Sequence, residues 1–103
     1  IGYFADNSKN IYSWDPLTAD GSTSAVKLAG VNYVFVHKIV GGNITVMDEG
    51  SLNGTDWFEL ESHSHSGSGT DAHFYSNSPV LYVRCTASNI GNGEEFHGSV
   101  MCD

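Results

Sequence analysis

The chain of 103 residues is long enough for one domain with a single core and too short for two. Its formal net charge of -8 would repel the phosphates of nucleic acids and anionic lipids, and no apolar run approaches the roughly 18 residues of a membrane span. We therefore expect no nucleic-acid partner and no membrane partner. The charged fraction of only 16% favours a protein that works within an assembly.

The first 24 residues combine turn-forming side chains with scattered aromatic residues and show no regular alternation. This composition predicts an extended N-terminal arm with a first short strand over residues 1–24, which wraps its own domain or reaches a neighbouring subunit. The aromatic residues of this arm that could contact another subunit are Tyr3, Phe4, Tyr12 and Trp14.

Residues 25–103 are predicted to form one all-β domain, because their apolar residues alternate or occur in short runs separated by Gly, Asn, Asp and Ser. Spacings of roughly 8–15 residues between the runs suit a small antiparallel β-sandwich of jelly-roll or immunoglobulin-like type, or a barrel. The predicted strands cover residues 25–28, 33–40, 43–49, 57–60, 80–87 and 95–102.

Three turns are predicted between these strands. Gly41 and Gly42 tolerate the positive φ of a tight hairpin, and the Gly-rich segment 90–93 reverses the chain before the last strand. Asn53-Gly54 is the preferred central pair of a type I′ turn and predicts a hairpin between residues 49–52 and 55–60. Within that hairpin, Trp57 is expected to anchor one face in the core.

Residues 62–72, with the sequence SHSHSGSGTDA, are predicted to form a polar and mobile loop. The imidazoles of His63, His65 and His73 are weak candidate ligands for Zn²⁺, Ni²⁺ or Cu²⁺. Because the entropy of ordering a mobile loop opposes binding, we expect no metal and no other cofactor. A response to pH near about 6 through the same side chains is a second possibility.

Two cysteines, Cys85 and Cys102, end apolar strand-like segments that could pair as a terminal hairpin. We expect both to be buried thiols, while a disulfide remains open in an oxidising compartment.

Motifs of catalytic sites are missing from the sequence. It contains no Gly-x-Ser-x-Gly elbow, no phosphate-binding Gly loop with its Lys and no His-Glu-x-x-His. Carboxylates in the middle of the chain could supply a glycosidase-like pair, but the polar faces of strands carry such groups routinely. We therefore expect no enzymatic activity.

Seven short motifs follow one another in a recognisable order. They are Trp14-Asp15-Pro16-Leu17, the turn Asp20-Gly21, the short strand 25–28, the Val-rich segment 33–36, the Gly-Gly turn and strand 41–46, the segment EGSLNGTDWFEL at 49–60, and Tyr82-Val83-Arg84. In this order, over about residues 11–102, the chain resembles small structural proteins of tailed bacteriophages. It departs from that pattern at Asn53, where Asp is usual, and in its His-rich segment.

The resemblance implies a non-enzymatic β-sandwich that binds the capsid exterior as a cement or decoration protein. Such a protein is often a homotrimer and clamps neighbouring subunits of the major capsid protein, after synthesis in the host cytoplasm. A tail or baseplate accessory protein of the virion is an alternative. The hairpin around Trp57 also resembles discoidin-like carbohydrate-binding domains, which would imply a host-surface glycan as partner.

Overall fold

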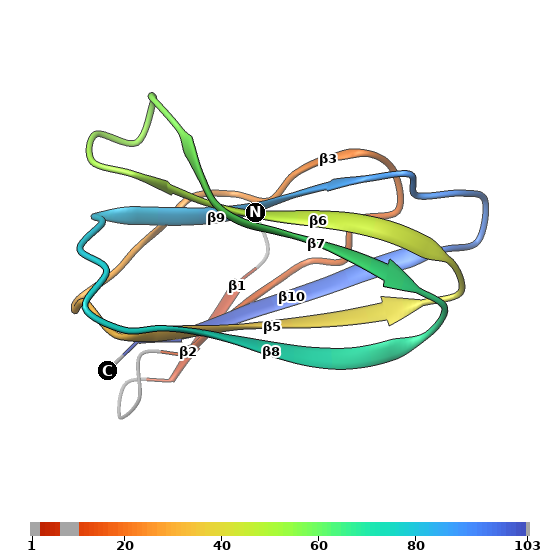
Figure 1. Cartoon of the computed structure of the whole chain (residues 1–103), viewed down its shortest axis with the longest axis horizontal. Helices are drawn as coiled ribbons and strands as arrows, with labels where there is room; N and C mark the ends of the chain where they lie inside the picture. Colours follow the sequence, from red (N-terminus) through yellow and green to blue (C-terminus); the bar gives the residue numbers. More distant parts are fainter. Residues whose placement is uncertain (1–2, 7–10, 103) are drawn as a thin grey trace.

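In the computed structural model, two antiparallel β-sheets pack face to face (Figure 1). The structure describes residues 3–6 and 11–102, the first of these ranges by its backbone alone. The described residues form strands, turns and loops and contain no helix. This part of the chain therefore has no helical segment that could span a membrane. The predicted small all-β sandwich is confirmed.

Each sheet contains five strands. The first sheet has the order β1-β2-β10-β5-β8, made of β1 (Tyr3–Asp6), β2 (Ile11–Trp14), β10 (Glu95–Cys102), β5 (Tyr33–Val40) and β8 (Gly69–Tyr75). The second has the order β3-β9-β6-β7, with β4 also paired to β9. Its strands are β3 (Gly21–Ser22), β9 (Tyr82–Ser88), β6 (Asn43–Ser51), β7 (Phe58–Ser66) and β4 (Val26–Lys27).

The segment assigned from sequence to the N-terminal arm contributes strands to both sheets. β2 lies between β1 and β10, and β3 pairs with β9. In the segment that connects β2 to β3, Leu17 exchanges two backbone hydrogen bonds of 2.9 Å with Phe96 of β10. Residues 11–22 are therefore built into the sandwich.

The core lies between the inner faces of the two sheets. Alternation along the strands supplies its side chains, as in β9, where Val83, Cys85 and Ala87 are buried. Both cysteines are buried, but Cys85 lies on β9 and Cys102 on β10, in different sheets. The expected terminal hairpin is therefore wrong, because residues 89–94 carry the chain from one sheet to the other.

The two tryptophans differ from expectation. Trp14 belongs to the core cluster, is only 6% exposed and stacks on Phe35 with ring centroids 6.4 Å apart. Trp57 is half-buried outside that cluster, with the Arg84 guanidinium 4.3 Å above its ring. The predicted core position of Trp57 is therefore wrong. It lies just before β7, which begins at Phe58.

The hairpin around Asn53 and Gly54 is present, but its turn is not type I′. Only Gly54 has positive φ, whereas a type I′ turn requires it at both central residues. Side-chain hydrogen bonds hold the loop instead. The Asn53 carboxamide oxygen accepts from the amides of Thr55 and Asp56, each at 2.9 Å, and the Ser51 hydroxyl accepts from the Gly54 amide at 2.9 Å.

The His-rich segment is a pair of strands joined by a tight turn, and the predicted mobile loop is wrong. β7 pairs with β6 from Asn43 opposite Ser66 to Gly50 opposite Phe58, whereas β8 pairs with β5. The turn between β7 and β8 therefore joins the edges of the two sheets (Figure 1). Alternation of His and Ser is a strand pattern, and it outweighed the Gly- and Ser-rich composition.

Gly98 in β10 lies where the core leaves no room for a side chain. A Cβ atom there would be 2.7 Å from Phe96 Cζ and 3.1 Å from Trp14 Cε3. We expect Gly98→Ala to lower the free energy of unfolding by about 1–3 kcal/mol, measured by chemical denaturation. The control is Gly21→Ala, where a Cβ meets nothing within 4 Å. Equal stability of the two variants would contradict this prediction.

Candidate functional site

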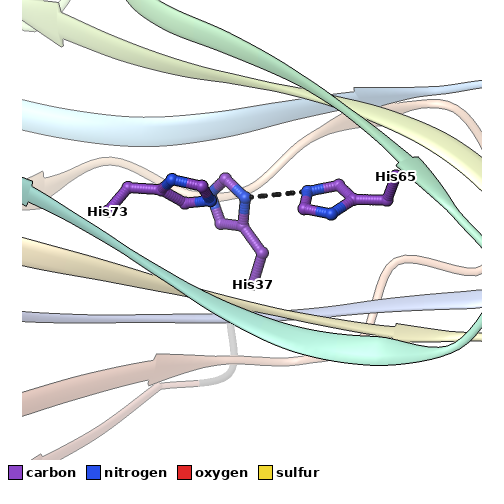
Figure 2. Close-up of side chains that lie close together, drawn as sticks. All are labelled: His37, His65 and His73. Atoms are coloured by element: carbon purple, nitrogen blue, oxygen red, sulfur yellow. Dashed lines mark hydrogen bonds between the residues drawn. The ribbon is translucent and has the colours of Figure 1, made fainter.

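Four of the five histidines come together between the two sheets, on the side where β7 and β8 form the sheet edges. They are His37 on β5, His63 and His65 on β7, and His73 on β8. Figure 2 shows the rings of His37, His65 and His73 converging from these three strands. We refer to these four side chains as the histidine cluster.

Close ring contacts hold the histidine cluster together. His37 Nδ1 lies 3.2 Å from His65 Nε2, the contact drawn dashed in Figure 2. The ring centroids of His37 and His73 are 4.5 Å apart, and His63 stacks on His73 with centroids 3.6 Å apart. His37 is completely buried, and only 7% of the His65 side chain is exposed.

Asp48 is a fully buried carboxylate at the inner end of the histidine cluster. Its Oδ1 atom lies 2.6 Å from His37 Nε2, and its Oδ2 atom accepts a 2.8 Å hydrogen bond from the Tyr75 hydroxyl. The Cys85 thiol lies 3.5 Å from Oδ1. Because a carboxylate only accepts hydrogen bonds, His37 Nε2 carries a proton.

The groups around Asp48 keep their protons. Burial, and then the charge of Asp48, raise the pKa of the Tyr75 hydroxyl and the pKa of the Cys85 thiol. Both groups are therefore donors to Asp48 at neutral pH.

Burial also acts on the histidines. It lowers the pKa of His65, with the nearby His37 ring as the next cause, although Asp71 opposes the shift. It likewise lowers the pKa of His73, with His37 and His63 adding to the effect. The neutral imidazole is thereby favoured at His65 and His73.

Two buried ring nitrogens of the cluster lack a hydrogen-bond partner among the described residues, His63 Nε2 and His73 Nε2. The former lies 3.1 Å from Glu61 Oε1 without forming a hydrogen bond. Such atoms are uncommon in folded proteins and point to a ligand or ion.

The sequence singled out His63, His65 and His73, and the structure brings all three together. Neither His37 nor Asp48 was expected beside these three histidines. A signal for His37 was present, because YVFVHKIV places this histidine on the same face as Tyr33, Phe35 and Ile39, which are all buried. A histidine on such a face needs a buried polar partner.

A second feature lies on the outer face of the first sheet. Register places four apolar side chains in one row across β8, β5, β10 and β2, namely Phe74, Val34, Met101 and Ile11. Phe74 is 78% exposed, and with Val34 and Met101 it borders a surface hollow of about 180 Å³. We call these four residues the outer apolar row.

The neighbouring row on this face contains small or aliphatic residues without charge: Ala72, Val36, Ser99 and Ser13. Charged side chains begin farther along, with Lys38, and with Glu95 hydrogen-bonded to His97 at 2.8 Å. The part of the face around Phe74 is therefore apolar and without charged side chains.

The predicted interface residues of the N-terminal segment have different positions. Trp14 is buried in the core, and Tyr12 is half-buried against it. The backbone of Tyr3 and Phe4 lies in β1, but their side chains lie outside the described residues. A subunit contact through these four residues stays a prediction.

Comparisons with known proteins assign no family. No known protein family and no curated protein match the chain. A solved structure of Bacillus endospore appendages, described as a novel family of disulfide-linked pili, is similar with 12% sequence identity and a TM-score of 0.42. The match covers 99% of this chain and 96% of that chain. At this level the likeness carries no argument, and the bacteriophage resemblance rests on sequence motifs alone.

Proposed function

We propose that the chain is a non-enzymatic structural protein that docks on a protein assembly through the outer face of the first sheet. The observation that carries this proposal is Phe74, a large aromatic side chain that is 78% exposed on the edge strand β8, at the end of an uncharged apolar row. Isolated apolar residues on a surface are ordinary, whereas a continuous row beside a hollow is typical of a binding surface.

The chemistry of this face suits a protein partner. Phe74 offers an anchor for a pocket on the partner, and the adjacent Ala72 and Ser99 allow a flat surface to approach closely. Burying the phenyl ring would contribute about 1.5–3 kcal/mol to binding.

The assembly that we propose is the shell of a tailed bacteriophage, with the major capsid protein as partner. The ordered motifs of residues 11–102 support this assignment, as does the low charged fraction of 16%. In this role the chain is a cement protein, a homotrimer on the capsid exterior, synthesised in the host cytoplasm.

The glycan alternative receives less support from the aromatic side chains. A sugar-binding platform needs exposed ring faces, but Trp14 is buried, Tyr75 stacks on Tyr33 at 5.2 Å, and Arg84 covers Trp57. A tail or baseplate position would use the same outer face and differs only in the partner.

The test of this proposal is the variant Phe74→Ser in a sedimentation assay with homologous capsids. Because the ring is exposed, we expect unchanged stability and a loss of capsid affinity of at least about tenfold. The matched control is Phe58→Ser, which removes a ring that is 46% exposed on β7 of the other sheet.

Light scattering on the same samples measures the molar mass of the particle, which is three times that of one chain if the protein is the proposed trimer. Capsid binding by Phe74→Ser at wild-type strength would contradict the docking surface. If the wild-type chain sedimented with phage tails but never with capsids, the result would contradict the capsid assignment and support a tail accessory protein.

A further inference from the structure

We infer that His37, His65 and His73 form a binding site for one divalent transition-metal ion of the Zn²⁺ type, located between the edges of the two sheets. This site goes beyond the proposed docking function, since it lies on the inner side of the first sheet and involves none of the outer apolar row. Each histidine offers a nitrogen atom, and the three nitrogens lie within 4.8 Å of one another.

The spacing between two of the ligands already fits a metal ion. His37 Nδ1 and His65 Nε2 are 3.2 Å apart. Two imidazole nitrogens bound to a tetrahedral Zn²⁺, each at about 2.0–2.1 Å from the ion, are about 3.3–3.4 Å apart. Only His73 has to move toward the ion, and its Nε2 atom is not held by a hydrogen bond among the described residues.

Carboxylates fix the orientation of both rings. His37 donates its Nε2 proton to Asp48 at 2.6 Å, and His65 donates its Nδ1 proton to Asp71 Oδ2 at 3.0 Å. With these two donated protons placed, His37 Nδ1 and His65 Nε2 face each other as the remaining ring nitrogens, 3.2 Å apart. A proton shared as a hydrogen bond, or a metal ion, can occupy the space between these two nitrogens.

This arrangement is that of ligating histidines in metalloproteins. Such histidines almost always donate the second ring N–H to a carboxylate, a carbonyl or water, which raises the basicity of the ligating nitrogen. Here a buried carboxylate, Asp48, and a surface carboxylate, Asp71, provide this support from two different strands.

The third ligand and the access route complete the site. The unpartnered Nε2 atom of His73 is buried beside the His37 ring, as Figure 2 shows. A hollow of about 310 Å³ lies over the turn between β7 and β8, where His65, Asp71 and serines line it. An ion could reach the histidines from this hollow, and water would supply the fourth ligand.

The bound ion would link the two sheets at their open edges. His37 and His73 come from the first sheet and His65 from the second. Since metal that binds only the folded chain stabilises it, the ion would act as a cross-link in the sandwich.

The experiment is a titration of the EDTA-treated, dialysed chain with ZnCl₂ alone, followed by calorimetry and by thermal melting. We expect one ion per chain, and a melting temperature that rises by about 10 °C when free zinc is about 100 times the dissociation constant. Titration with Co²⁺ gives an independent signal, because tetrahedral coordination by nitrogen produces characteristic visible absorption.

The variants His65→Ala and His73→Ala are each expected to weaken zinc binding by about 100-fold and to abolish the Co²⁺ absorption. His37→Ala is avoided, because removal of a fully buried partner of Asp48 would disturb folding. The matched control is His97→Ala, the remaining histidine, which lies on the outer face of the first sheet bonded to Glu95.

If both His65→Ala and His73→Ala bound zinc with the affinity of the wild-type chain, the proposed site would be wrong. Equal weakening by His97→Ala, or a wild-type chain that binds no zinc, would also contradict the site. Since the outer apolar row is untouched by these variants, capsid sedimentation of His65→Ala separates failure of the metal site from failure of the docking surface.

Discussion

Replacement of Asp48 with alanine is expected to lower the free energy of unfolding by about 3–5 kcal/mol, because removal of one partner of a buried polar network leaves the others unsatisfied. The imidazole of His37 at 2.6 Å and the hydroxyl of Tyr75 at 2.8 Å would lose their acceptor. Both sheets would be affected, since Asp48 is on β6 and the other two residues are on β5 and β8.

Urea denaturation of the metal-free chain measures this loss. The conservative variant Asp48→Asn keeps one acceptor oxygen and is expected to cost less, about 1–3 kcal/mol. The matched control Asp71→Ala removes a carboxylate that is 58% exposed and bonded to His65, and it should cost at most about 1 kcal/mol. An Asp48→Ala variant as stable as Asp71→Ala would contradict the network.

The strands were predictable from sequence where alternation is regular. Residues 33–40, 43–49 and 95–102 were predicted as strands and coincide closely with β5, β6 and β10. Strand neighbours were not predictable in the same way. β10 pairs with β2 and β5, which are far away in the chain, and such pairing depends on long-range packing.

The same limit explains what was missed in the histidine cluster. The alternation in His63-Ser64-His65 places both imidazoles on one face of an extended segment, whereas the Gly- and Ser-rich composition around them favours a loop. The pattern of residues 33–40 indicates a buried His37, but its partner Asp48 could not be read from the sequence, because the pair requires β5 and β6 to face each other across the core.

Replacement of Trp14 with alanine is expected to cost about 3–5 kcal/mol, the usual range for a large buried aromatic residue. The side chain is 6% exposed, and its indole N–H donates a 2.9 Å hydrogen bond to the Ser24 carbonyl. Its loss would leave a cavity beside Phe35 and would detach β2 from the core.

The matched variant is Trp57→Ala, for which we expect a smaller cost of about 1–2 kcal/mol, because the ring is half-buried and packs mainly under Arg84. This reverses the order expected from the sequence, where Trp57 was assigned to the core.

The chain has two tryptophans, so each variant retains one, and its fluorescence emission measures how buried the remaining indole is. Fluorescence of Trp57→Ala, with Trp14 remaining, should be shifted to the blue as for a buried indole, and that of Trp14→Ala to the red. Denaturation curves give the energies on the same samples. If Trp57→Ala proves the more damaging variant, or if its emission is that of an indole in water, then the packing of β2 against the core is wrong.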